Sequence, residues 1–120
     1  MEYDKNNVFA RILRKEIPAN IVYENDVALA FHDVYPKAPT HILVIPKGEF
    51  IAFDDFAAQA SAEEIIGFNQ AVHHVIQTFS LQEKGYRLLS NQGLHGCQEV
   101  PHYHVHILGG KHLGPPLSSS

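Results

Sequence analysis

Three histidines occupy every second position in the segment EVPHYHVHILGG, residues 99–110. They are His102, His104 and His106, and their alternation restricts local structure more than any other feature of the chain. In a strand, residues two positions apart lie on the same face, so the three imidazoles share one face and the apolar residues between them share the other. In a helix, residues two positions apart point about 200° apart, which would scatter the rings. Residues 103–108 are therefore predicted to form a strand, with an apolar face in the core and a histidine face toward a helix, a loop or a ligand.

The apolar pattern elsewhere predicts four more strands and two helices. The strands are expected at residues 21–23, 27–31, 41–45 and 86–89, with a tight turn between the first two. A short helix is expected to begin after Asn7 and to end before Pro18, because proline disfavours helical geometry in the residue that precedes it. The longest helix is expected at about residues 61–79, where a capping box of the form S-x-x-E precedes apolar residues at helical spacing. Together these elements predict an α+β fold with a five-stranded, mostly antiparallel sheet, one long helix and one short helix.

Length and charge narrow the class of protein. A chain of 120 residues favours a single domain over 1–120, with a C-terminal tail from about 111 to 120. The net charge is −4 and the longest run of basic residues is Arg14-Lys15, so a nucleic-acid polymer is not an expected partner. No apolar run approaches the roughly 20 residues that span a bilayer, and the first residues do not resemble a signal peptide. With one cysteine and no internal disulfide, the protein is expected to be cytoplasmic, without a membrane partner.

The three histidines allow three interpretations. A metal site is one, but the Cα atoms of His102 and His106 would lie about 13 Å apart on a strand, whereas zinc–nitrogen bonds are about 2.0–2.1 Å. A single ion could therefore bind two of the rings but not all three without strain. Structural histidines bonded to backbone carbonyls are a second interpretation. The pattern favours the third, a catalytic one, because a neutral imidazole is both a nucleophile and a proton carrier near pH 7. The middle ring, His104, is the predicted nucleophile, since both neighbours can then assist it.

The loop before the histidine strand supports an anionic ligand. Residues 91–99 read NQGLHGCQE and contain two glycines among amide and carboxyl side chains. Glycine allows backbone N–H groups to turn toward a phosphate. An ordinary connecting loop is the alternative, but its position directly before the histidines favours a phosphate-binding loop.

The histidine segment also resembles a known signature. HYHVHIL, residues 102–108, resembles the histidine triad, in which three histidines alternate with apolar residues. The segments RILRKEIPANIVYEND (11–26), ALAFHDVYPKAPTHILVIPK (28–47), GYRLLSN (85–91) and HILGG (106–110) extend the likeness over most of the chain. On these segments the chain is identified as similar to the histidine triad (HIT) family, and in particular to its Hint branch of nucleotide-binding proteins.

This resemblance implies a fold, a partner and a reaction. It implies a HIT fold whose five-stranded sheet joins that of a second copy in a homodimer, with a purine nucleotide bound to each subunit. The implied reaction is hydrolysis of purine nucleoside phosphoramidates, or of aminoacyl-adenylates, to a nucleoside monophosphate without a cofactor. His104 would attack the α-phosphorus and form a nucleotidyl-histidine, and His106 would contact the phosphate. His102 would hold the other ring nitrogen of His104 through its backbone carbonyl, and His41 would support the triad from the neighbouring strand.

The resemblance also implies a set of ligand contacts. The nucleotide pocket would contain Phe9, Ile17, Phe31, His32, Asp33 and Val34. The phosphate and the leaving group would lie against Asn91, Cys97, Gln98 and Glu99. Asp33 is placed to accept hydrogen bonds from the ribose hydroxyls, although a turn residue is its plain alternative. For Phe9 and Ile17 the alternative is a place in the core, and for Cys97 it is simple packing.

Some positions depart from the family pattern. Certain bacterial relatives bind zinc through a CxxC pair near the N-terminus, but Asn7 and Ala10 stand at those positions here, so no metal is predicted. Glu99 stands where some members have Ser or Thr, which leaves the preferred leaving group open. Two other functions share the histidine triad: hydrolysis of dinucleoside polyphosphates, as in the related Fhit proteins, and a nucleotide-dependent interaction module with little catalysis.

Overall fold

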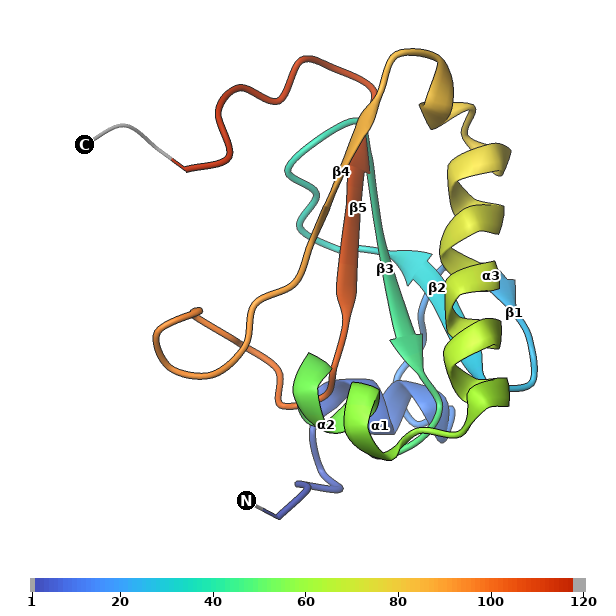
Figure 1. Cartoon of the computed structure of the whole chain (residues 1–120), viewed down its shortest axis with the longest axis vertical. Coiled ribbons are helices and arrows are strands. Elements are labelled where there is room, and N and C mark those ends of the chain that lie inside the picture. The colour runs from blue at the N-terminus through green and yellow to red at the C-terminus, as the bar shows by residue number, and fades with distance from the viewer. Residues whose placement is uncertain (1, 118–120) are drawn as a thin grey trace.

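Five strands form one antiparallel sheet in the computed structural model, which describes residues 2–117 (Figure 1). The spatial order of the strands is β1-β2-β3-β5-β4. Each neighbouring pair is antiparallel, as the sequence predicts. The strand bounds are β1 Ile21–Glu24, β2 Ala28–His32, β3 Thr40–Pro46, β4 Tyr86–Leu89 and β5 Val105–Gly109.

Three α-helices accompany the sheet, α1 (Val8–Leu13), α2 (Phe53–Gln59) and α3 (Ala62–Thr78), and a 3-10 turn, η1 (Leu81–Glu83), precedes β4. The side chain of Ser61 accepts a hydrogen bond from the backbone N–H of Glu64, and the Glu64 side chain bonds back to Ser61, so the predicted capping box begins α3. Asn7 caps α1 in a similar way, by accepting from the backbone N–H of Ala10. The two predicted helices are therefore present, and α2 is an additional one.

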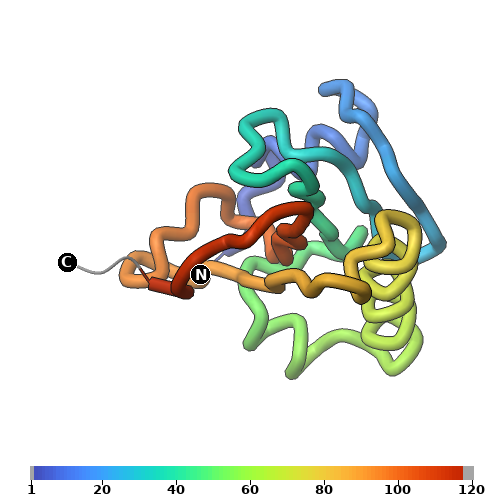
Figure 2. Tube along the Cα trace, turned by 90° about the horizontal axis from the view of Figure 1, so that it is seen from above, coloured from blue at the N-terminus to red at the C-terminus, as the bar shows by residue number. Residues whose placement is uncertain are grey.

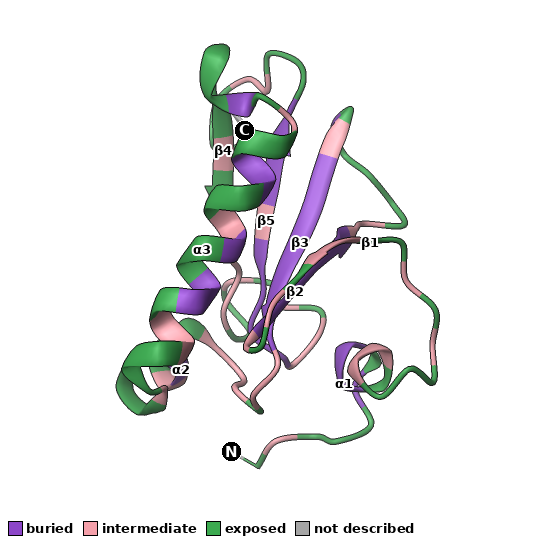
Figure 3. Cartoon of the chain, turned by 90° about the vertical axis from the view of Figure 1, so that its right-hand side faces the viewer, coloured by how far each residue is buried: buried purple, intermediate pink, exposed green. Residues whose placement is uncertain are grey.

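Side chains alternate between two apolar clusters, one on each face of the sheet. Figure 3 shows the central strands β3 and β5 coloured mostly as buried, with α3 on one side and α1 on the other. On the α3 face, the central strands contribute a row of fully buried small and branched residues: Ala28, Ala30, Ile42, Val44 and Ile107. On the opposite face, which α1 covers in part, they contribute Leu29, Phe31, Leu43 and Ile45, against Phe9 of the helix. Because both faces of β3 are buried, this strand is apolar throughout its centre and holds the register of its neighbours.

The histidine strand is shorter than predicted. We expected it over residues 103–108, but β5 begins at Val105, opposite Val44 of β3, and only His106 lies within it. The residue that would pair with Tyr103 is Pro46, which has no backbone N–H to donate. The chain instead bonds outside the sheet, with the backbone N–H of Tyr103 donating to the carbonyl of Phe50. His102 and His104 therefore lie in an extended lead-in to the strand.

Two helical boundaries also differ from expectation. The first helix ends at Leu13 rather than near Pro18, because Lys15 takes a left-handed backbone conformation with φ of 64° and stops the hydrogen-bonded ladder. Helix α2 was not expected, since only Phe53 and Phe56 carry its apolar spacing and Phe53 is exposed. Asp55 stabilises the start of α2 by accepting from the backbone N–H groups of residues 51 and 52.

Residues 111–117 leave the sheet after β5 as an irregular segment (Figure 2). Arg87 of β4 donates to the carbonyl of Gly114, which holds the middle of this segment beside the sheet edge. Residues 1 and 118–120 of the expected domain and tail lie outside the described part of the chain. Within the described part, none of the helices combines the length and apolarity that a membrane crossing requires.

Candidate active site

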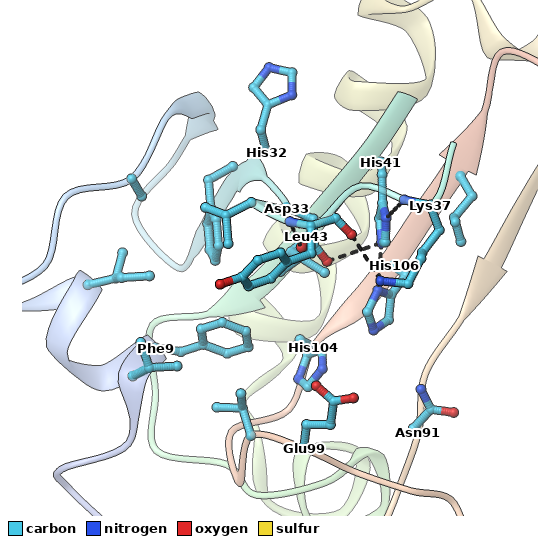
Figure 4. A pocket seen from close by; sticks show the side chains of 18 of the residues that line it. Phe9, His32, Asp33, Lys37, His41, Leu43, Asn91, Glu99, His104 and His106 are labelled. Carbon is cyan, nitrogen blue, oxygen red and sulfur yellow. Dashed lines mark hydrogen bonds and ion pairs between the residues drawn. The ribbon is translucent and has the colours of Figure 1, made fainter. Parts of the chain in front are cut away.

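A cavity of about 620 Å³ opens on the α1 face of the sheet. Its apolar wall comes from α1 and β2, and its polar wall comes from the loop after β2, from β5 and from the loop before β5 (Figure 4). Twelve of the fourteen sequence-predicted residues line it: Phe9, Ile17, Phe31, His32, Asp33, Val34, His41, Asn91, Cys97, Glu99, His104 and His106. His102 and Gln98 are the two that do not.

His104 presents one defined ring nitrogen to this cavity. Its Nδ1 lies 2.7 Å from the backbone carbonyl oxygen of His102, and a carbonyl can only accept, so Nδ1 carries the proton. The neutral ring then has its lone pair on Nε2. Burial lowers the pKa of His104 against the opposing effects of the His102 carbonyl and two nearby carboxylates, Asp33 and Glu99. Near pH 7, His104 is therefore a neutral imidazole with a free nucleophilic nitrogen.

The position of the His104 ring is fixed from several directions. The edge of the Phe9 ring packs against it with 5.0 Å between centroids. The backbone carbonyl of His104 accepts from the hydroxyl of Ser90 at 2.6 Å, which ties the end of β4 to the lead-in segment. The residue is only 6% exposed, so the ring has little freedom to turn away from the cavity.

His106 offers the complementary group, a ring N–H. The backbone N–H of Lys37 donates to Nδ1 of His41 at 3.0 Å, which leaves the proton of neutral His41 on Nε2. That Nε2 lies 2.9 Å from Nδ1 of His106 and 3.3 Å from Oδ2 of Asp33. Nδ1 of His106 therefore accepts, and its own proton lies on Nε2. Burial, together with repulsion from the neighbouring histidines, lowers the pKa of His106 to about 4.

His102 lies behind the cavity, and it is completely buried. Its Nε2 lies 2.8 Å from the carbonyl oxygen of Pro46, so Nε2 carries the proton and Nδ1 accepts from the hydroxyl of Tyr3. Burial lowers the pKa of His102 to about 4. The first histidine of the alternation thus contributes its carbonyl to the site, while its ring is bonded within the protein interior.

One group of side chains could hold a metal ion. Asp33, His41 and His106 each offer one ligand atom, and these atoms lie within 4.8 Å of one another. Carboxylate and imidazole ligands suit a first-row transition metal. The shared position is bridged here by the proton between His41 and His106, which a metal would have to displace. The side chain of Asn7 is bonded to the backbone of Asp4 and Ala10.

The loop at residues 91–99 is held together by Gln98. Its side-chain oxygen accepts from the backbone N–H of Gly93 at 2.9 Å, and its amide donates to the carbonyls of Ile51 and Val100. This explains why Gln98 does not line the cavity. Gly96 is sterically required, because an added Cβ would come within 2.3 Å of the backbone oxygen of Gln92. The loop can therefore place Asn91, Cys97 and Glu99 along the cavity rim.

Sequence reasoning missed several cavity residues and one residue behind it. Lys37 lines the cavity and lies in the same loop as Asp33. Its positive charge was a sequence signal for an anionic ligand. Further apolar lining comes from Val8, Ile12, Pro18, Ala19, Tyr35, Leu43, Leu89, Val100 and Leu108. Tyr3 gave no signal, because it is separated from His102 by 99 positions in the chain.

The chain is similar to known proteins over most of its length. The sequence model of the HIT domain matches residues 14–113. A 13.2 kDa HIT-like protein of Azospirillum brasilense is 55% identical over 116 residues, which cover 97% of this chain and 95% of that protein. The purine nucleoside phosphoramidase of Escherichia coli K12 is 42% identical over 115 residues, which cover 95% of both chains. A HIT family hydrolase structure from Legionella pneumophila superposes with a TM-score of 0.84 at 39% identity, covering 92% of this chain and 98% of that one.

Proposed function

The chain belongs to the HIT domain family, whose members similar to it include hydrolases, and on this premise we propose that it hydrolyses purine nucleoside phosphoramidates through a covalent intermediate on His104. The observation that carries the proposal is the fixed tautomer of His104: its Nδ1–H is bonded to the His102 carbonyl, and its Nε2 is free at the cavity. A neutral ring held in this way can attack phosphorus without first losing a proton.

The proposed reaction has two steps. First, Nε2 of His104 forms a bond to the α-phosphorus while the bond from phosphorus to the amine nitrogen breaks. Second, water attacks the phosphorus and the bond to His104 breaks, which releases a nucleoside monophosphate. The amine takes up a proton from solvent as it leaves in the first step, and the attacking water gives up a proton to solvent in the second, so that over both steps one water molecule is consumed and its hydroxyl goes to phosphorus. The Nε2–H of His106 is placed to donate to the phosphate oxygens as negative charge develops on them.

The walls of the cavity suit the other parts of a nucleotide. Phe9, Ile17 and Phe31 supply an apolar surface on which a purine base can pack, and a volume of about 620 Å³ is within the usual range for small-molecule sites. Asp33 lies between this surface and the histidines, where its carboxylate can accept from the ribose hydroxyls. Lys37 adds positive charge beside His106, which favours an anionic ligand.

The test is hydrolysis of adenosine 5′-phosphoramidate by the wild type and by His104→Ala. Loss of a covalent nucleophile should lower kcat by at least about 1000-fold, and a nucleotidyl adduct on the wild type should be absent from the variant after rapid quenching. His73→Ala is the matched control, since His73 is an exposed histidine of α3. Equal rates for wild type and His104→Ala would overturn the proposal. Faster turnover of diadenosine triphosphate than of the phosphoramidate would assign the chain to the dinucleoside polyphosphate hydrolases instead.

We also propose that the protein is a homodimer joined through β4. This strand is at the edge of the sheet and carries three exposed large apolar residues, Tyr86, Leu88 and Leu89. Edge strands of this kind pair readily with another chain, and a second copy offers the same edge in antiparallel orientation.

Light scattering should give twice the chain mass of 13.4 kDa for the wild type and a lower mass for Leu88→Glu. Ile21→Glu, on the exposed opposite edge of the sheet, is the control and should leave the mass unchanged. A wild type of single-chain mass would refute the dimer.

A further inference from the structure

Tyr3 is joined to the candidate nucleophile by two hydrogen bonds that pass through one residue. Its hydroxyl donates to Nδ1 of His102, and the backbone carbonyl of His102 accepts from Nδ1 of His104. Tyr3 lies 99 positions before His102 and outside the residues 14–113 that the HIT domain matches. The part of the chain that the HIT domain matches therefore does not include it.

The hydrogen bonds of His102 restrict the movement of both its ring and its backbone. The residue has four polar atoms and all of them are paired: the backbone N–H with the carbonyl of Val100, the carbonyl with His104, Nε2 with the carbonyl of Pro46, and Nδ1 with Tyr3. The ring is completely buried between the end of β3 and the N-terminal segment. The angle of the ring is therefore set by Pro46 on one side and Tyr3 on the other, and the backbone is held by the bonds to Val100 and His104.

The N-terminal segment is anchored well enough to serve as a support. The amide of Asn7 donates to the carbonyl of Asp4 at 2.7 Å, and the guanidinium of Arg14 donates to the carbonyl of Lys5 at 2.8 Å. The ring of Tyr3 also packs edge-on against the ring of His102, with centroids 5.6 Å apart. Tyr3 is not among the cavity-lining residues, and its hydrogen-bonded link to His104 runs through His102.

We propose that Tyr3 is a positioning residue for His104: its hydroxyl locks the His102 ring, which holds the carbonyl that fixes the tautomer and angle of the His104 ring. This inference rests on the proposed function for its kinetic test. Without the hydroxyl, Nδ1 of His102 is a buried acceptor with no donor, and the ring and its backbone shift to relieve it. The bond from His104 to the carbonyl then weakens, and a smaller fraction of His104 has its lone pair on Nε2.

The variant Tyr3→Phe removes the hydroxyl alone and keeps the ring packing. We expect kcat for adenosine 5′-phosphoramidate to fall about tenfold, with KM within twofold of the wild type, because misplacing a reacting group slows chemistry without removing a substrate contact. Tyr23→Phe is the matched control: Tyr23 stacks on His74 away from the cavity, and its loss of a hydroxyl should leave both constants unchanged. Urea unfolding of each variant shows how much protein is folded at the assay temperature.

A second measurement does not depend on turnover. In the wild type with 15N-labelled histidine, the ring nitrogens of His104 should report a single tautomer, protonated at Nδ1, and in Tyr3→Phe they should move toward a mixture of the two tautomers. Unchanged kcat together with unchanged ring signals would overturn the inference, as would an increase in KM at constant kcat. If the wild type does not hydrolyse the phosphoramidate, the proposed function fails, and the ring signals alone decide the role of Tyr3.

Discussion

Acid should destabilise this protein in a pH range that its buried histidines define. His102 has a pKa of about 4 in the folded chain because of burial, against about 6.5 for an unfolded histidine. Between these two values the unfolded chain binds more protons than the folded chain, so the free energy of unfolding decreases as the pH falls. The stabilisation is complete above about pH 6.5 and is lost progressively toward pH 4.

The size of the effect follows from the two pKa values. At pH 5, linkage gives a loss of about 2 kcal/mol for His102 relative to pH 8. His106 has the same folded pKa of about 4, but its side chain is only partly buried and its pKa is also lowered by His104 and His41. We assign it about 1 kcal/mol, which makes the loss for these two rings about 3 kcal/mol at pH 5. Burial also lowers the pKa of His41 and of His104, which adds to this loss. Carboxylates titrate mostly below this range, so the histidines dominate it.

Urea unfolding at pH 8, 7, 6 and 5 measures this loss directly. The variant His106→Asn removes one titrating ring and should reduce the decrease between pH 8 and pH 5 by about 1 kcal/mol, while His73→Asn, on the exposed surface of α3, should leave it unchanged. A wild-type free energy of unfolding that stays constant to within about 1 kcal/mol from pH 8 to pH 5 would refute the assignment of neutral buried histidines.

Three further outcomes are expected. Asp33→Asn should raise KM for a ribonucleotide phosphoramidate about tenfold, because the proposed carboxylate contact is with the ribose hydroxyls. The same variant should have little effect on KM for the 2′,3′-dideoxy analogue, and equal effects on both substrates would exclude that contact. Gly96→Ala should lower the thermal unfolding midpoint and kcat together, since its Cβ would come within 2.3 Å of the backbone oxygen of Gln92. Gly85→Ala is strained by a φ of 100° but has open space around its Cβ, so it should lower the unfolding midpoint and leave kcat unaltered. Prolonged dialysis against a chelator should leave phosphoramidate hydrolysis intact, because the proposed nucleophile is a ring nitrogen that carries its own lone pair. Loss of activity that zinc restores would instead assign a metal to Asp33, His41 and His106.

The sequence predicted an element best where several consecutive residues repeat one pattern of burial or hydrogen bonding. The apolar residues of β2 and β3 and the capping box of α3 predicted those elements because burial and hydrogen bonding act there on consecutive residues. The alternation at 102, 104 and 106 correctly placed these residues away from the apolar cluster that holds Tyr103, Val105 and Ile107. Short elements were harder: α2 has only one buried aromatic residue in seven, so its sequence shows no helical period.

Only the tertiary structure decided what each histidine does with its two nitrogens. The sequence singles out His104 by its middle position, but the alternation does not say which nitrogen of each ring carries the proton. Contacts from distant segments decide this, through Pro46 and Tyr3 for His102 and through His41 for His106. His104 alone bonds to a neighbour in the sequence, the carbonyl of His102. A tautomer is set by which partner can donate and which can accept, and those partners lie up to 99 positions away along the chain. The pattern therefore determined that a face of imidazoles exists, and folding determined which ring is left with a lone pair at the cavity.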